Sequence, residues 1–479
     1  MKIQHFMALT LACLLVAAPA TAQVNYAVFG GTAYVTDSPN AAGDIVIAST
    51  YNGFPVTRIR FYAFSGCTNL TSVTIPSGVT VIDQQPFVGC TGLTNLSVEA
   101  DNPVYRSLDG VLFDKAQTTL ITYPAARAGG YVIPGSVTRI ERYAFTQCRS
   151  LTSVTVPNSV TGIGSGVFWG CTSLTSATIP NSVTSIVSDT FRGCASLTNV
   201  VIGHSVASIG SSAFDGCASL TRVMIPNSVT SIGFGPFNGC TSLTNLSVDA
   251  THAAFSSLDG VLFDKAQTTL LMFPPGRGSY VMPDSVTRIG TSLYAGSPGA
   301  FFYCTGLTNV IIGNSVTNIG YAAFAYCTNL TRLTIPASVI NLGSSAFRDC
   351  SRLTNFTFLG HAPTRIFDFD AGFAQFQNVG AGAKAYYYCG TTGWSANYGG
   401  LPTMMLCPPG IAPGSAGVKP GGFGFTLTRL TNQTIVVEAS ANLVNWQPIW
   451  TNTPPGASAD FVDPEWLNHS NRFYRARSD

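Results

Sequence analysis

The stretch Cys194–Phe214 reads CASLTNVVIGHSVASIGSSAF, and its pattern recurs along most of the chain. Ten cysteines share one frame, with a Phe three residues before each of them and a Leu three residues after. Seven of the nine gaps between them are 23 residues long; they stand at positions 67, 90, 148, 171, 194, 217, 240, 304, 327 and 350. Self-similarity with such a period is typical of a solenoid, in which successive coils stack on one another.

The spacing inside Cys194–Phe214 predicts how one coil is built. Leu197, Val200 and Ile202 follow an L-x-x-L-x-L pattern, whose alternation of apolar and polar residues predicts a strand with one buried face. A Pro ends this strand in several coils, as at Pro180, because Pro cannot donate a ladder hydrogen bond. Val206 and Ile209 predict a second buried segment, the return leg of the coil. Ala213-Phe214 predicts a short turn that packs against the core.

A single coil is not expected to be stable. Its apolar side chains gain ~1.5–3 kcal/mol each on burial, whereas ordering each residue costs roughly 1–2 kcal/mol in backbone entropy. Only neighbouring coils that share one continuous core can reverse that balance.

The repeat resembles the BspA-type leucine-rich repeat of secreted bacterial surface proteins. The motif I-P-x-S-V-T-x-I-G-x-x-A-F-x-G-C-x-x-L-T stands nearly whole at Ile179–Thr198 and Ile225–Thr244. The resemblance covers about residues 26–406, from an opening coil at Gly30–Tyr34 to a closing segment at Thr391–Thr403. It implies a mostly β protein of the α/β solenoid class, a right-handed leucine-rich repeat solenoid with a parallel sheet on its concave side. It also implies an adhesive or host-contacting protein.

The N-terminus matches a secretory signal peptide over residues 1–22. Lys2 gives a positive start, residues 6–18 form a short apolar run, and Ala20-Thr21-Ala22 fits a cleavage site. The run is too short for a transmembrane helix, which needs about 20 apolar residues. Cys13 leaves a lipoprotein signal as an alternative. We expect an exported, soluble protein without an integral membrane segment, secreted or held at the cell surface.

Two insertions interrupt the frame, at about residues 99–130 and 249–279. Ser107–Leu120 recurs unchanged at Ser257–Leu270, so a block of the chain has been duplicated. Asp109-Gly110 between apolar residues predicts a hairpin with a tight turn. Counting one strand at each frame Leu and one after each insertion, the sequence predicts twelve sheet strands after the first coil.

The composition also predicts the domain organisation. The solenoid is expected over residues 23–407, with a first coil at 23–62 and a closing segment at 359–407. Residues 408–422 are rich in Pro, Gly, Ala and Ser, which is typical of a linker. Residues 423–479 contain five short apolar segments separated by turn residues and predict a small antiparallel β module. Its role stays open between anchoring, sorting, glycan binding and an accessory domain.

The low charge excludes some classes of protein. Only 10% of the residues are charged, and 24 Lys and Arg balance 22 Asp and Glu, so the formal net charge is +2. Electrostatic binding to nucleic acid needs clustered basic surface, and disorder needs low hydrophobicity with high net charge. We therefore expect an ordered protein that does not bind nucleic acid.

The ten frame cysteines are expected to be buried thiols. Stacked equivalents lie about 4.8 Å apart, but their parallel Cα–Cβ bonds suit disulfide geometry poorly. Cys389 and Cys407 fall outside the frame and are the candidates for a disulfide. The cysteine spacing suggests no metal site. Asp114 and Asp264 recur by duplication, and no nucleophile motif is present, so we expect no cofactor, metal or catalytic residue.

The outward positions of the sheet strands are the feature with functional content. Most carry Ser, Thr or Asn, and a few add apolar area or a guanidinium, which is frequent at binding hot spots. The candidate binding residues on the concave face are Asn199, Val201, Arg222, Met224, Asn245, Asn309, Ile311 and Arg332. The alternative interpretation is an ordinary β surface, on which Ser and Thr fit well.

Three functional hypotheses remain at this point. The first is a secreted, non-enzymatic protein that binds an unknown protein or glycan at the cell surface, through the concave face or the two insertions. The second is a passive structural or envelope protein without a specific ligand. The third is a glycan-processing enzyme. The sequence does not predict the oligomeric state.

Overall fold

The structure is a computed structural model that describes residues 24–290, 299–366, 375–406, 409–428, 434–469 and 472–478. The predicted signal peptide, residues 1–22, lies outside these ranges. The chain divides into two compact units, Met1–Leu243 and Thr244–Asp479, each with its own ladders of strands.

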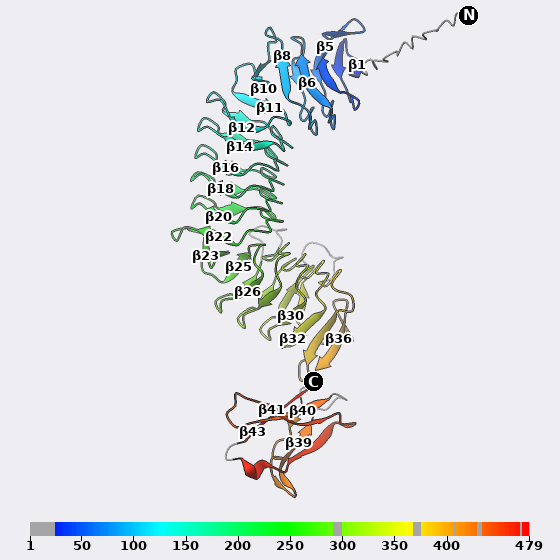
Figure 1. The fold of residues 1–479 in the computed structure, drawn as a ribbon, viewed down its shortest axis with the longest axis vertical. Coiled ribbons are helices and arrows are strands. Elements are labelled where there is room, and N and C mark those ends of the chain that lie inside the picture. Colours follow the sequence, from blue (N-terminus) through cyan, green and yellow to red (C-terminus); the bar gives the residue numbers. More distant parts are fainter. Residues whose placement is uncertain are drawn as a thin grey trace, which may run out of the picture. The chain divides into compact units, whose positions relative to one another are not determined.

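In the first unit, successive coils each contribute one strand to parallel ladders (Figure 1). Ser176 pairs with Asn199 and Thr178 with Val201, so residues one frame apart lie side by side. Middle residues such as Val200 are buried and their neighbours are exposed, as the alternation predicts. These strands are β3 (Gly43–Val46), β6 (Leu70–Ile75), β8 (Asn95–Val98), β12 (Gly129–Val132), β14 (Leu151–Thr155), β16 (Ser176–Thr178), β18 (Asn199–Val201) and β20 (Arg222–Ile225).

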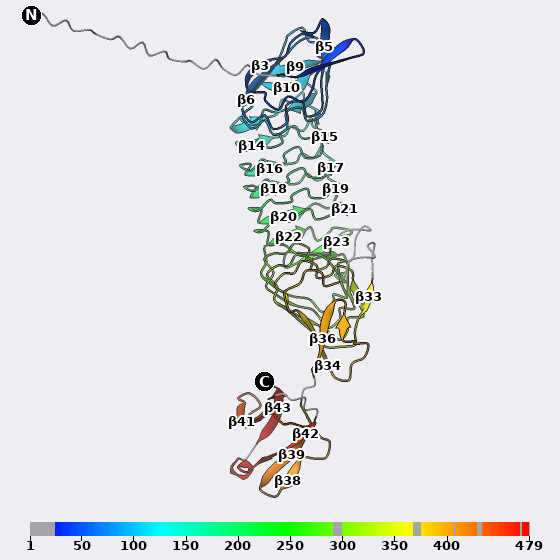
Figure 2. The same ribbon diagram turned by 90° about the vertical axis from the view of Figure 1, so that its right-hand side faces the viewer.

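The return legs form a second set of parallel ladders on the other side of the coils (Figure 2). Most of their strands are only two residues long. They are β5 (Phe54–Ile59) and β7 (Val81–Ile82), then β11 (Thr119–Thr122), β13 (Arg139–Ile140) and β15 (Gly162–Ile163), then β17 (Ser185–Ile186), β19 (Ser208–Ile209) and β21 (Ser231–Ile232). The first coil adds β1 (Tyr26–Phe29), β2 (Thr32–Val35) and β4 (Thr50–Tyr51).

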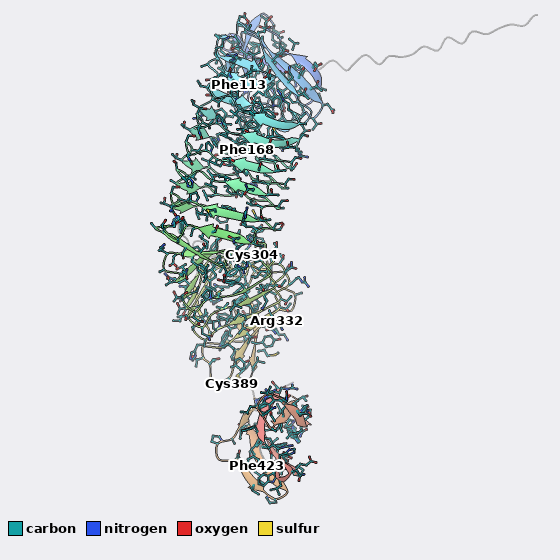
Figure 3. The ribbon with its side chains drawn as sticks, turned by 60° about the vertical axis from the view of Figure 1, so that its left-hand side comes forward. Phe113, Phe168, Cys304, Arg332, Cys389 and Phe423 are labelled. Carbon is teal, nitrogen blue, oxygen red and sulfur yellow. The ribbon has the colours of Figure 1, made fainter. Side chains whose placement is uncertain are left out.

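A file of aromatic rings runs through the core where each coil turns back toward the sheet. The centroids of Phe168 and Phe191 lie 5.2 Å apart, and those of Phe191 and Phe214 lie 5.3 Å apart. All three side chains are fully buried (Phe168 is labelled in Figure 3). Each ring therefore stacks on its equivalents, which is why the frame keeps Phe at this position.

The first insertion forms the predicted hairpin. Its strands β9 (Tyr105–Leu108) and β10 (Val111–Asp114) are antiparallel, and Asp109 and Gly110 turn with φ of 47° and 74°. Strand β11 then pairs antiparallel with β10 and parallel with β13. Residues 111–113 are fully buried (Phe113 is labelled in Figure 3). The insertion is thus part of the solenoid core.

The second unit repeats this architecture. Its sheet strands are β22 (Asn245–Val248), β26 (Ser279–Val281), β28 (Asn309–Ile311), β30 (Arg332–Ile335), β32 (Asn355–Phe358), β34 (Lys384–Tyr388) and β36 (Leu401–Leu406). Its insertion contains β23 (Phe255–Leu258) and β24 (Val261–Asp264), and its return ladder contains β25 (Thr269–Met272), β27 (Arg288–Ile289), β29 (Asn318–Ile319), β31 (Asn341–Gly343) and β33 (Thr364–Ile366). With those of the first unit, all twelve predicted sheet strands are present. Strand β35 (Asn397–Tyr398) pairs with β36.

The C-terminal module is antiparallel, as predicted. Its strands are β37 (Gly410–Ile411), β38 (Gly417–Lys419), β39 (Gly422–Thr428), β40 (Ile435–Ser440), β41 (Gln447–Asn452), β42 (Ser458–Asp463) and β43 (Phe473–Ser478), with a short 3-10 helix at Trp466–Asn468. Strands β37 and β38 lie inside the segment predicted as a linker, and both pair with β39. The β structure of the module thus begins earlier than its composition suggested.

Candidate functional site

The candidate residues of the first unit all lie on the outward face of its sheet. The side chains of Asn199 and Arg222 are exposed, and Val201 and Met224 expose 50% and 66% of their surface. The strands β18 and β20 that carry them are in contact. Two apolar side chains and a guanidinium are therefore displayed together on a rigid β surface whose other outward residues are mostly Ser and Thr.

A similar group lies on the outward face in the second unit. Val281 and Ile311 are register partners on β26 and β28 and expose 65% and 53% of their surface. The side chains of Asn245, Asn309 and Arg332 are also exposed (Arg332 is labelled in Figure 3).

Sequence reasoning missed part of these groups. Val281 has a counterpart in the first unit, Val132, which is 70% exposed. The two residues directly follow Tyr280, which is buried, and Tyr131, which is partly buried, in the strands after the two insertions. The alternation of these strands could have identified both residues as outward-facing. They extend the apolar character of the face beyond the predicted set.

The buried thiols have a shared bonding partner that the sequence did not predict. The Sγ of Cys194 donates to the carbonyl oxygen of Phe168 at 3.1 Å, and the Sγ of Cys217 donates to that of Phe191 at 3.2 Å. Each thiol therefore ties its coil to the carbonyl of the stacked Phe one coil earlier. The same contact is made from Cys90, Cys171, Cys240, Cys327 and Cys350.

Burial lowers the reactivity of these thiols. Desolvation raises the pKa of Cys90 and of Cys217 to about 12. It also raises the pKa of Cys304 well above its ordinary value. Because the thiolate is the reactive form of cysteine, these groups are poor nucleophiles near neutral pH.

The predicted pairing of Cys389 with Cys407 stays a prediction. Cys389 is partly exposed directly after β34, and Cys407 lies outside the described residues. The parallel register pairs Tyr388 with Leu406, the residues that precede the two cysteines. Titration of thiols in unfolded, unreduced protein would measure the pairing.

The recurring aspartates have a structural role. The carboxylate of Asp114 accepts the backbone N–H groups of Thr118 and Thr119 at 2.7 and 2.8 Å, and the Thr118 hydroxyl at 2.6 Å. Asp264 does the same in the second copy. Within the described residues, no group of three or more His, Cys, Asp or Glu side chains could hold a metal ion.

The family of the chain follows from its repeats. A family model described as BspA type Leucine rich repeat region, in six copies, matches residues 48–125, 129–258 and 278–368, which is more than half of the chain. The chain belongs to this family. No curated protein matches it.

Several solved structures resemble this BspA-type protein. A leucine rich cell surface protein from Faecalibacterium prausnitzii A2-165 is 26% identical with a TM-score of 0.44, over 70% of this chain and 86% of that one. A leucine-rich repeat protein from Bacteroides ovatus ATCC 8483 is 22% identical with a TM-score of 0.42, over 80% and 98%. The pneumococcal vaccine antigen PcpA is 18% identical with a TM-score of 0.35, over 77% and 92%.

Membership of the BspA-type family supports a general role in binding or adhesion through the repeats. In the described part of the chain there is no helix long and apolar enough to cross a membrane.

Proposed function

We propose that this BspA-type protein is exported and binds a macromolecular partner at the cell surface through the outward face of its parallel sheet. The observation that supports this proposal is the exposure of Val201 and Met224 beside Arg222. Contiguous apolar area on a soluble protein commonly marks an interaction site. Met adapts to partners of different shape, and Arg is enriched at binding hot spots.

The arrangement favours binding over chemistry. The two duplicated aspartates are used to hold the turns after β10 and β24. The candidate residues on the face carry apolar, amide or guanidinium groups, which recognise a surface but neither donate nor accept a proton near neutral pH. The partner is therefore held and not transformed.

A binding screen tests this proposal. The protein is immobilised and exposed to glycan arrays and to bacterial and host surface extracts, and saturable binding is measured. We expect Met224→Ala and Arg222→Ala each to weaken binding about tenfold, which corresponds to ~1.4 kcal/mol. Thr155→Ala, an exposed position on the same face two coils from Val201, should leave it unchanged.

Two results would contradict the proposal. One is saturable binding that neither substitution alters. The other is concentration-dependent assembly by light scattering that Met224→Ala abolishes, with no binding to any glycan or extract, since the face would then serve self-association in a structural layer.

A further inference from the structure

A cavity of about 270 Å³ lies beside the first insertion. We call the segment between the return-leg strand of a coil and its stacked Phe the outer corner. The walls of the cavity are the outer corners of two coils, within residues 82–88 and 141–146, and its floor includes Ile121 and Tyr123. This volume exceeds the ~150 Å³ of a cavity that accommodates benzene.

The cavity exists because the coil between these walls has a shortened corner. In an ordinary coil, four residues separate the return-leg Ile163 from the stacked Phe168, but only two separate Leu120 from Tyr123. Tyr123 takes the place of the Phe: its N–H donates to Ala144 O at 2.8 Å, and its ring lies 4.9 Å from that of Phe145. The core is thus continuous at this level, whereas the outer corner is missing.

The missing corner leaves main-chain groups of both walls without partners. In complete coils, the backbone N–H two residues before the stacked Phe donates to a carbonyl oxygen in the corner of the next coil, as Tyr143 N–H does to Ser165 O at 3.0 Å. Among the described residues, the N–H groups of Gln85 and Phe87 find no acceptor on one wall, and the carbonyl of Arg142 finds no donor on the other. The cavity therefore presents donors and an acceptor at the positions that a peptide corner normally occupies.

The acidic side chains that line the cavity are already engaged, including Glu141, whose carboxylate accepts from Arg139 at 2.9 Å. Arg142 also lines the cavity and is exposed. Both carboxylate oxygens of Asp83 accept hydrogen bonds from Arg58, and one also accepts the N–H of Phe61. The Asp114 carboxylate binds the backbone of the turn that follows β10. Free carboxylates that could bind sugar hydroxyls or a cation are thus lacking at these two positions.

We propose that this cavity binds a short segment of peptide main chain with small, uncharged side chains, supplied by a protein partner. A carbonyl of the segment accepts from the N–H of Gln85, and an N–H of the segment donates to the carbonyl of Arg142. The segment replaces the missing corner, and the apolar floor excludes water from these hydrogen bonds. This site is independent of the sheet face.

Hydrogen exchange with a synthetic peptide tests the proposal. The probe is acetyl-Gly-Ser-Ser-Ala-amide, which reproduces the corner Gly210–Ala213. In the full chain, we expect fast exchange at Gln85 and Phe87 that slows at least tenfold with saturating probe. Exchange at Phe168, whose N–H already donates to Thr190 O at 2.8 Å, should not change. Acetyl-Gly-Glu-Glu-Ala-amide, whose side chains are large and charged, is the control peptide and should not slow exchange at Gln85 or Phe87.

Variants separate this site from the sheet face. Thr122→Trp places an indole in the cavity from β11, and we expect it to abolish the saturation-transfer NMR signal of the probe. Met224→Ala should leave that signal unchanged, whatever it does to binding at the face. The proposal is overturned if exchange at Gln85 is already slow without probe, if the probe protects nothing, or if neutral oligosaccharides protect the segment and the peptide does not.

Discussion

At the residue scale, the contacts of the frame cysteine explain why it recurs in each coil. Its side chain is fully buried, and its thiol donates to the Phe carbonyl of the neighbouring coil. The sequence predicted the burial of these cysteines from their spacing. It could not predict the carbonyl contact, because that contact depends on how far one coil is displaced relative to the next.

Replacing one frame cysteine measures this contribution. We expect Cys217→Ala to lower the free energy of unfolding by about 1–2 kcal/mol, since it removes a donor and leaves a small void. The measurement is the urea midpoint followed by circular dichroism. Thr178→Ala on the exposed face should stay within ~0.5 kcal/mol of the parent. An equal effect of both substitutions would contradict a specific role for the thiol.

The buried thiols also predict a dependence of stability on alkaline pH. Burial raises the pKa of Cys90 and Cys217 from 9.0 to about 12, so the unfolded chain loses these protons first. Their contribution is therefore complete below pH 9 and declines as the pH rises toward 12. We expect the urea midpoint to fall over this range, and less steeply for Cys217→Ala. A midpoint that is constant up to pH 11 would refute this expectation.

At the element scale, the two insertions show what a duplicated motif can indicate. Asp109-Gly110 predicted the hairpin correctly, because this dipeptide favours the positive φ angles of a tight turn. That the hairpin is buried in the core could not be predicted, since its apolar residues fit an exposed binding hairpin equally well. The shortened corner before Tyr123 is visible in the sequence only once the stacking position of that residue is known.

The Asp264 carboxylate is expected to hold the turn between β24 and β25. Partial burial raises its pKa, but hydrogen bonds from Thr269 and Thr268 outweigh this and lower it. We expect Asp264→Ala to destabilise the protein by about 1–3 kcal/mol. The difference should be present above the ordinary Asp pKa and vanish as the pH falls through the lowered value. Denaturant midpoints measured in steps from pH 7 down to pH 2 follow it, and exposed Asp284→Ala is the matched control. A difference that does not shrink as the pH falls below the ordinary Asp pKa would exclude this role.

At the scale of the whole molecule, the coils are interchangeable because each contacts mainly its neighbours. We expect deletion of residues 172–194, one full period, to leave a folded protein with the same circular dichroism per residue. Deletion of residues 172–183 removes about half a period and should prevent cooperative folding, since Cys and Phe would no longer meet their partners. Cooperative melting of the shorter deletion would show that the frame does not control stacking.

The fold of the solenoid could be predicted from the sequence more completely than the set of residues exposed on its surface. Ten of the twelve sheet strands followed from the frame leucines, because every coil repeats the same contacts, and two followed from the segments after the insertions. Val132 and Val281 were missed because the L-x-x-L-x-L pattern, which gave the outward positions, does not extend to the strands that follow the insertions. Strands β37 and β38 were missed because Gly- and Pro-rich segments form short edge strands as readily as linkers.

The identical copies at Ser107–Leu120 and Ser257–Leu270 carry a genetic consequence. Unequal crossing-over between the gene segments that encode the coils would lengthen or shorten the gene by whole repeats. Each such step would preserve the thiol–carbonyl hydrogen bonds and the stacking of the Phe rings. Natural alleles should therefore differ in size by whole turns, and a lineage could adjust the reach of the protein without inventing any new contact.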